Sequence, residues 1–183
     1  MATTGSVESG QLAALSKSTT LVSLTIGGND VGFVPVMATC VVLPTSLCVT
    51  AVHTAEGMIR TTLPAELDQL LADIHADAPN ATVVVLGYPE PYDMTKSASC
   101  PGLSGTDRTD LNQAASQLDG QLQAAADRYG YVFADVRPYF AEHQICDSGA
   151  WLNSVDWLDL GVSYHPTAAG QAGAYYPAFS AAG

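Results

Sequence analysis

Hydrophobic and polar positions divide the chain into short strands and longer helices that alternate. Residues 20–26 (TLVSLTI) alternate, are rich in branched side chains and end at two glycines. Residues 81–86 (ATVVVL) are continuously apolar, and residues 131–136 (YVFADV) form a third such run. Branched runs that end at Gly or Pro are typical of strands. A strand that is apolar on both sides is typical of a parallel sheet with helices on both faces.

Helical periodicity occupies the stretches between and after these strands. Residues 54–76 place Leu, Ile and Met on one broad stripe, which predicts an amphipathic helix. Pro64 interrupts this stripe, so we expect a kink or two helices there. Residues 109–129 predict a second helix that stops at Gly130. Residues 167–179 predict a C-terminal helix, weakened by two internal glycines.

This order of elements predicts an α/β fold with right-handed crossovers, and nothing divides residues 1–183 into more than one domain. In such sheets the chemistry lies where the strands end at their carboxyl edge. The turns at 27–30 (GGND) and 87–89 (GYP) mark that edge. Residues 34–52 and 91–106 each contain cysteine, and we expect them to form irregular, disulfide-tied loops over the active edge.

Composition narrows the possible functions. Hydrophobic residues make up 48% of the 183 residues and charged residues 13%, which favours a globular protein. The formal net charge is -12, and no cluster of basic residues suits nucleic acid or an anionic membrane. No apolar stretch is long enough to span a bilayer. Residues 1–10 lack the basic start and apolar run of a signal peptide, so none is present in this chain.

The four cysteines predict two disulfides and an oxidising, extracellular compartment. Cys40 and Cys48 would close a short loop and Cys100 and Cys146 a long one, although three pairings are possible in principle. A metal site is the rival interpretation, but the chain has no Cys-x-x-Cys pair and no paired His. We therefore expect no metal and no cofactor.

A Gly-Gly-Asn-Asp turn follows the first strand. Glycines at a strand end let the backbone turn sharply and approach a ligand closely. The side-chain amide of Asn29 would then lie at the sheet edge, where it can stabilise an oxyanion during ester hydrolysis. The alternative is an ordinary turn in which Asn29 or Asp30 caps a helix.

His165 lies in the stretch Ser163–Thr167 (SYHPT), just before the C-terminal helix. A His on such a loop is fixed in place, and its ordinary pKa suits a general base. The alternative is a histidine with only a packing role. His53, His75 and His143 lack a comparable setting.

Together these two motifs resemble the third and fifth sequence blocks of the SGNH/GDSL hydrolases, and in particular the extracellular lipases and esterases of Streptomyces-like actinobacteria. The resemblance runs in order through LVSLTIGGNDVGF, TLPAELDQL, VVVLGYP and SYHPTAAGQ. It implies a flavodoxin-like three-layer fold with strand order 2-1-3-4-5, and a secreted ester hydrolase that forms an acyl-enzyme. It also implies Asn29 and Gly28 at the oxyanion hole and His165 as the base.

Two departures from the family pattern concern the nucleophile and the acid. No Gly-Asp-Ser block occurs in the chain, so the nucleophile is unknown and we expect an N-terminally truncated domain. The early serines do not lie in a strand-to-helix turn that would expose a reactive hydroxyl. Val162 stands where the family has Asp. The resemblance to the Streptomyces-like branch implies that a backbone carbonyl orients His165 instead, with Ser163 as the candidate and Asp159 or Asp156 as side-chain alternatives.

Truncation has consequences for assembly and function. Without the family's first strand, residues 20–26 would form an exposed sheet edge, which favours a homodimer or aggregation. Tyr88, Tyr92, Phe33 and Met94 can line an acyl pocket for lipid or small-molecule esters or can simply pack in the core. The second function class is a catalytically incompetent remnant or binding domain.

Overall fold

The computed structural model describes residues 2–99, 102–156, 158 and 162–183. Three strands in this part form one parallel sheet in the order β1-β2-β3. They are β1 (Leu21–Leu24), β2 (Thr82–Leu86) and β3 (Val132–Ala134). Each strand falls inside its expected run, and the α/β fold class is confirmed.

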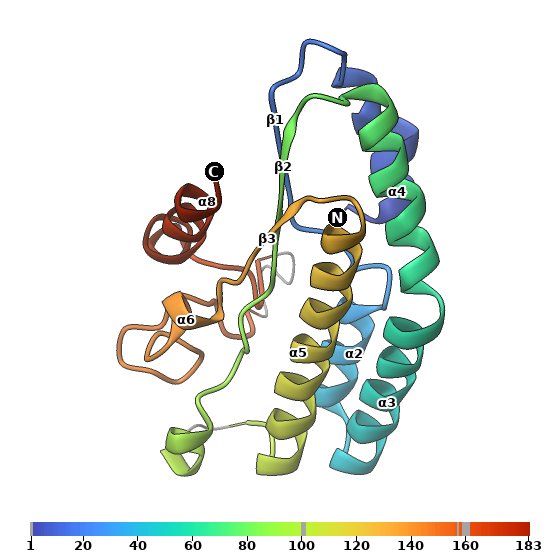
Figure 1. The fold of residues 1–183 in the computed structure, drawn as a ribbon. Helices are drawn as coiled ribbons and strands as arrows, with labels where there is room; N and C mark the ends of the chain where they lie inside the picture. Colours follow the sequence, from blue (N-terminus) through green and yellow to red (C-terminus); the bar gives the residue numbers. More distant parts are fainter. Residues whose placement is uncertain (1, 100–101, 157, 159–161) are drawn as a thin grey trace.

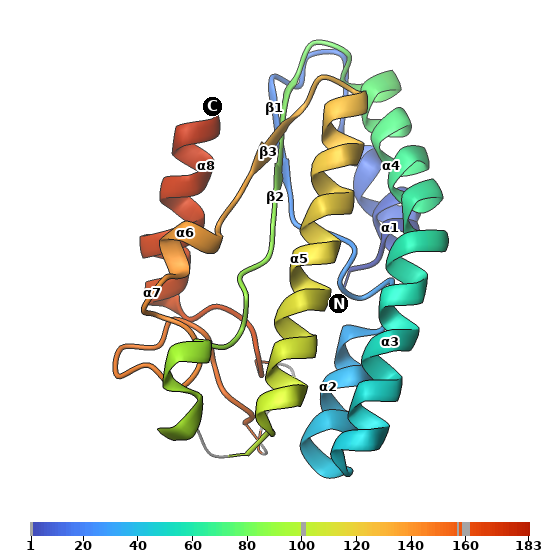
Figure 2. The same ribbon diagram turned by 60° about the horizontal axis from the view of Figure 1, so that its bottom comes forward.

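The strand β2 is apolar throughout because its alternate side chains enter two different hydrophobic cores. Val83 and Val85 pack into one hydrophobic cluster, whereas Val84 and Leu86 pack into another. Helices α4 (Leu63–Asp77) and α5 (Gly105–Arg128) supply the first cluster. The short α6 (Arg137–Phe140) and the C-terminal α8 (Tyr176–Ala182) lie on the opposite side of the sheet, so both faces are covered (Figures 1 and 2).

The expected break at Pro64 separates two helices. The α3 helix (Thr45–Thr61) ends at Thr61, and a single residue separates it from Leu63, where α4 begins. Pro64 lies in the first turn of α4, where a missing backbone N–H leaves no hydrogen bond unmade. The buried side chain of Leu63 fixes the junction in the core.

The expectation of an irregular loop over residues 34–52 was wrong. This stretch forms helix α2 (Phe33–Val42) and the first half of α3. Its Thr and Val residues are weak helix formers, so the sequence gives little helical signal. Packing compensates for this, because Met37, Cys48 and Val52 are buried in the core.

The helical segments near the C-terminus follow one another without a break. They are α7 (Ala168–Gly170), η4 (Gln171–Tyr175) and α8, and the hydroxyl of Thr167 caps the first of them. The two glycines that weaken the helical pattern make room for Trp151. A Cβ at Gly173 would overlap the Trp151 ring, and one at Gly170 would press on its backbone.

Two further groups of short helical segments lie before α5 and at the N-terminus. A short 3-10 segment, η3 (Met94–Ser99), precedes α5, whose first turn is closed by a capping box from Ser104 and Asp107. At the N-terminus, α1 (Thr4–Ser6), η1 (Val7–Gln11) and η2 (Leu12–Ala14) pack against α4.

The outer side of β1 is an open edge within the described residues. β1 pairs with β2 alone, and Leu21 is 50% exposed. The carbonyl of Thr20 accepts the Thr82 N–H, so Leu21 and Ser23 turn their backbone polar groups away from β2. The sequence-based expectation of an exposed edge is met in this part of the chain.

Candidate active site

An apolar cavity of about 380 Å³ lies beyond the carboxyl ends of β1 and β2. Helices α2, α3 and α5 extend past the sheet on this side (Figures 1 and 2) and form its walls. Asn29, from the turn after β1, and His165, from the turn before α7, both line this cavity. Two motifs 136 positions apart in the sequence therefore meet at one site.

The turn after β1 depends on its glycines. Gly27 has a φ of 103°, a conformation that side chains disfavour. A Cβ on Gly28 would come within 3.2 Å of the Tyr88 hydroxyl, so a larger residue would press on that ring. The same hydroxyl accepts the Gly28 N–H at 3.2 Å. Gly28 is therefore held against Tyr88 at the edge of the cavity.

Asn29 presents its side-chain amide to the N-terminal segment. Its Nδ2 donates to the carbonyl oxygen of Ala2 at 2.8 Å. The neighbouring Asp30 accepts two bonds from Thr4, one from the backbone N–H at 2.9 Å and one from the hydroxyl at 2.8 Å. Neither residue caps a helix, because α2 begins after Gly32. The amide of Asn29 is thus oriented by a partner that itself lines the cavity.

A short antiparallel ribbon carries His165. Leu152 bridges to Pro166, the Asn153 N–H donates to the His165 carbonyl at 2.9 Å, and the Tyr164 N–H donates to the Asn153 carbonyl at 3.0 Å. Tyr164 has a φ of 64°, a left-handed conformation that costs about 1 kcal/mol. The backbone of His165 is therefore tightly placed, whereas its imidazole is exposed and makes no hydrogen bond to a described residue.

The groups expected to orient His165 are only partly described. Ser163 is buried, and its hydroxyl accepts the Asp156 N–H at 2.9 Å. The side chain of Asp156 accepts the Leu158 N–H. Asp159 lies outside the described residues. The orientation of the imidazole by the Ser163 carbonyl stays a prediction.

No serine or cysteine lines the cavity within the described residues. Ser6, Ser9 and Ser16 make local bonds in the N-terminal segment, and Ser23 lies on β1. The hydroxyl groups that do line the cavity belong to Thr25 and to tyrosines. The described site thus contains the proposed base and amide donor without a serine beside them.

Among the described residues, the walls of the cavity contain no Asp, Glu, Lys or Arg side chain. Phe33 and Tyr88 line the cavity as expected, whereas Tyr92 and Met94 do not. Phe33 packs edge-to-face on Tyr164 with ring centroids 6.1 Å apart. The remaining apolar lining residues of the helices are Val36, Val52, Ala55, Ile59, Leu111, Ala114, Ala115 and Leu118.

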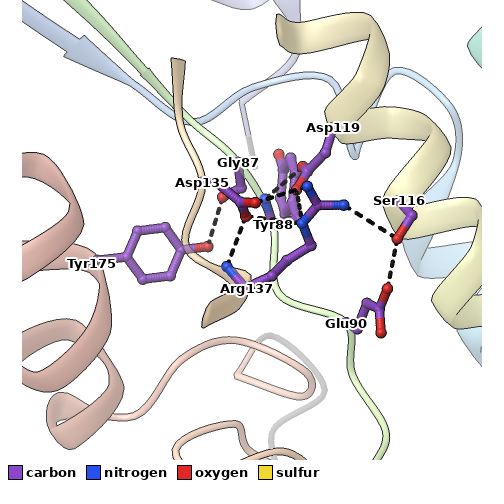
Figure 3. Close-up of polar contacts among 8 residues, drawn as sticks. All are labelled: Gly87, Tyr88, Glu90, Ser116, Asp119, Asp135, Arg137 and Tyr175. Atoms are coloured by element: carbon purple, nitrogen blue, oxygen red, sulfur yellow. Dashed lines mark hydrogen bonds and ion pairs between the residues drawn. The ribbon is translucent and has the colours of Figure 1, made fainter. Parts of the chain in front are cut away.

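The buried carboxylate of Asp119 holds the backbone that follows β2 at the edge of the cavity. Asp119 on α5 accepts the Tyr88 N–H at 2.8 Å, and its second oxygen lies 3.5 Å from the Nε of Arg137 (Figure 3). A Cβ on Gly87 would come within 2.8 Å of that oxygen, so Gly87 is what lets Asp119 reach the end of β2. Tyr175 also binds here, donating its hydroxyl to the Gly87 carbonyl at 3.3 Å.

Burial raises the pKa of Asp119 to about 7. The Tyr88 N–H and the Arg137 guanidinium oppose this rise, whereas Asp135 and Glu90 add to it. Arg137 is itself held by two 2.8 Å bonds to Asp135 and therefore compensates Asp119 only in part. The sequence-based prediction did not include Asp119, and its only signal is an acidic residue between the apolar positions 118 and 122 of a helix.

The other histidines have packing roles or lie apart from the cavity. The ring of His143 stacks on Trp151 at 3.7 Å, and its Nδ1 lies 2.9 Å from the Gly149 carbonyl. His75 contacts Tyr131, and His53 is exposed on α3.

The Cys40–Cys48 disulfide is present, with a Cα–Cα distance of 4.3 Å. Cys146 is also disulfide-bonded, whereas Cys100 lies outside the described residues. Over the described ranges no group of three His, Cys, Asp or Glu side chains is arranged to hold a metal ion. In the same ranges, every helix is too short or too polar to cross a bilayer.

Comparison with known proteins identifies the family. Residues 2–172 match the model of the GDSL-like Lipase/Acylhydrolase family. The chain belongs to this family. Lipase 1 of Streptomyces coelicolor is 48% identical over 99% of the chain, and a lipase of Streptomyces rimosus is 42% identical over the same share. The chain spans 67% of the length of each of these relatives.

Two solved structures superpose closely on the chain. They are phospholipase A1 from Streptomyces albidoflavus NA297 and an extracellular lipase from Streptomyces rimosus, each with a TM-score of 0.96 and 43% identity. Each match covers 100% of this chain and 77% of the solved chain. The predicted Streptomyces-like branch of GDSL ester hydrolases is confirmed, and the disulfide and the extracellular relative fit secretion.

Proposed function

We propose that the cavity binds the acyl part of an ester while Asn29 and His165 act on its carbonyl group. The observation that carries this proposal is that both residues line one largely apolar cavity. Ester hydrolysis needs a base for proton transfer and a donor for the oxyanion of the tetrahedral intermediate. A neutral imidazole and a side-chain amide supply these two groups.

In this mechanism His165 takes the proton of a hydroxyl nucleophile as the C–O bond to the acyl carbon forms. It returns that proton to the alkoxide that leaves, and an acyl-enzyme remains. His165 then activates water in the same way, and the ester bond to the enzyme breaks. The nucleophile is unassigned, because no serine lines the described cavity.

Asn29 is the oxyanion donor in this proposal. Its Nδ2 already donates to the Ala2 carbonyl, and the developing oxyanion would take the place of that carbonyl. A charged acceptor makes a stronger hydrogen bond than a neutral carbonyl, so the exchange favours the intermediate. Gly28 contributes by keeping the turn close to Tyr88, because a side chain there would displace the turn.

The Ser163 carbonyl is the proposed acceptor for the second nitrogen of His165. Ser163 is buried and its hydroxyl is bound to the backbone of Asp156, so its peptide group is held in place. A carbonyl fixes the tautomer of an imidazole but stabilises the imidazolium less than a carboxylate would.

Lipid esters are the proposed substrates. Walls of Val, Ile, Leu and Ala favour an aliphatic chain, because burying apolar surface stabilises the complex. Relatives of the chain are named lipases and a phospholipase A1, and these names support the proposal that the substrates are lipid esters. We further propose that the protein is secreted, since one relative is named an extracellular lipase.

Turnover of p-nitrophenyl esters by the purified chain tests the proposal. The parent chain is expected to hydrolyse these esters, and the Asn29→Ala and His165→Ala variants are expected to lose most of that rate. Equal rates in all three proteins would rule out the proposed site.

A second candidate function is acyl binding without turnover. The observation that favours it is the lack of a serine in the described lining of the cavity. A binding domain of this kind would hold a fatty acid in calorimetry but would not cleave the matching p-nitrophenyl ester. The two measurements on one protein sample separate the candidates.

The open side of β1 is proposed to pair with another copy of the chain. Leu21 and Ser23 leave backbone donors and acceptors on that side without a described strand. Unpaired edges of this kind promote association between chains.

A further inference from the structure

Helix α2 is apolar on the face that it turns to solvent as well as on the face that it buries. Phe33 and Val36 line the cavity, and Met37 and Cys40 are in the core. A helix that is hydrophobic on all sides is normally buried on all sides. Nevertheless part of α2 is exposed, and the exposed residues from this helix to the start of α3 include Val34, Pro35, Ala38, Val42, Leu43, Pro44 and Leu47. We call these residues the apolar tip.

The apolar tip is held together by a disulfide. Val42 is 65% exposed, Leu43 is 45% exposed and Leu47 is 48% exposed. All three lie between or beside Cys40 and Cys48, whose Cα atoms are 4.3 Å apart. The side chains therefore share one tight turn. This turn lies at the end of the molecule farthest from the amino ends of the strands (Figures 1 and 2).

The tip carries no charge, although the protein as a whole is strongly acidic, with a net charge of -12. No Asp, Glu, Lys or Arg occurs between Val31 and Ala55, although the whole chain has 18 acidic and six basic residues. The hydroxyl of Thr39 in α2 is bound internally, because it donates to the Pro35 carbonyl at 2.8 Å. Ser46 is the exposed polar residue within this turn, and the exposed side chains around it are aliphatic. The surface thus offers mainly aliphatic contact and few polar groups that would specify a protein partner.

We propose that the apolar tip docks on the surface of zwitterionic lipid and so brings the cavity close to that surface. The helix that carries the tip also contributes Phe33 and Val36 to the wall of the cavity, so docking would place the cavity beside the lipid esters. The evidence for docking comes from the residues of the tip alone. The delivery of an ester to His165 rests on the proposed function.

The net charge of the protein and the small size of the tip favour zwitterionic lipid over an anionic lipid surface or a protein partner. The net charge of -12 repels an anionic surface but not a zwitterionic one. Stable protein interfaces use about 20–30 residues on each side and a polar rim, whereas the tip is a small group of aliphatic residues. Binding at a lipid surface scales with the apolar area that is buried, so a few aliphatic side chains give weak, reversible attachment.

Flotation with phosphatidylcholine vesicles tests the docking. The parent chain is expected to rise with the vesicles in a density gradient. The Leu43→Ser/Leu47→Ser variant is expected to partition at least about tenfold less, because each leucine loses the gain from burial in lipid. The Val34→Ser/Val42→Ser variant on α2 should show a loss in the same direction. Vesicles of phosphatidylglycerol should bind the parent more weakly than phosphatidylcholine at low salt.

A matched control uses exposed apolar residues elsewhere. Val132 on β3 is 38% exposed and Tyr176 on α8 is 67% exposed, and neither belongs to the tip. The Val132→Ser/Tyr176→Ser variant should float like the parent. Circular dichroism of each variant shows that the fold is kept, since every changed side chain is at the surface.

Two results would overturn the proposal. One is a parent chain that does not float, or tip variants that float as well as the parent. The other is a dimer that the Leu43→Ser/Leu47→Ser change dissociates, which would mean that a second copy covers the tip. The His165→Ala variant should float normally, so loss of docking and loss of ester hydrolysis are separate outcomes.

Discussion

The side-chain amide of Asn29 donates to the carbonyl oxygen of Ala2 across 2.8 Å. This bond joins the turn after the first strand of the sheet to the N-terminal segment, and both residues line the cavity. It fixes the direction of an amide that the proposed mechanism uses as an oxyanion donor. The donor is therefore oriented before a substrate arrives.

Removal of this amide should slow ester hydrolysis with little effect on the fold. The Asn29→Ala variant is expected to lose about 100-fold to 1,000-fold in kcat, which is typical for an oxyanion donor. Loss of the bond to Ala2 should cost only about 1 kcal/mol of stability. Steady-state kinetics and thermal melting measure the two effects. Asn80→Ala, in an exposed turn, is the control, and an equal loss of kcat there would contradict the assignment.

The raised pKa of Asp119 predicts a stability that falls as pH rises. The pKa of Asp119 in the folded protein is about 7, whereas an ordinary Asp carboxyl loses its proton near pH 3.8. Between these values the folded state holds more protons, so the free energy of unfolding decreases with increasing pH. Full deprotonation removes up to about 4 kcal/mol, given the difference between the two pKa values.

The Asp119→Asn variant isolates this contribution. Its amide stays neutral, so its stability relative to the parent should increase as pH rises from about 4 to 8. Urea unfolding at a series of pH values measures the difference. Asp127→Asn, on the exposed side of the same helix, should show no such trend. A parent-to-variant difference that is constant with pH would contradict the raised pKa of Asp119.

The width of the cavity should set the length of the acyl chain. Ala115 on α5 lines the cavity, and Ala115→Leu adds bulk to that wall. The variant is expected to keep its rate on p-nitrophenyl butyrate and to lose about tenfold or more on the laurate, because an overfilled apolar site is destabilised. Ala124→Leu, exposed on α5, is the control. An unchanged preference in the Ala115 variant would show that the acyl chain lies elsewhere.

The exposed edge of β1 predicts association that a single proline can prevent. Ser23 turns its backbone N–H away from β2, so Ser23→Pro removes an outward donor and leaves the β1–β2 hydrogen bonds in place. Sedimentation of the parent should show dimers that grow with concentration, and the variant should remain monomeric. A monomeric parent at all concentrations would refute pairing at this edge.

The sequence predicted those features that depend on local patterns. The continuous run of residues 81–86 indicates a strand buried on both faces, and Pro64 indicates a boundary between helices because it lacks an N–H. The Asn29 and His165 motifs were located from the glycines and the proline beside them. Glycine permits backbone conformations that other residues disfavour and proline fixes φ, so both mark a turn without a structure.

The features that were missed depend on contacts between distant residues. Helix α2 is stabilised by core packing and by the disulfide to Cys48 rather than by helix-forming residues. Asp119 receives its role from Tyr88 and Arg137, which come from other elements. No periodic pattern or propensity of α5 predicts which of its polar residues is buried against a strand end.

Ester turnover by His165→Ala tests the central assignment most directly. Loss of the general base should lower kcat on a p-nitrophenyl ester by about 100-fold or more. His53→Ala, at an exposed site on α3, should stay within about twofold of the parent. Added imidazole should restore part of the rate of His165→Ala alone, since the vacated volume adjoins the cavity. A parent, a His165→Ala variant and a His53→Ala variant with the same rate would contradict the account.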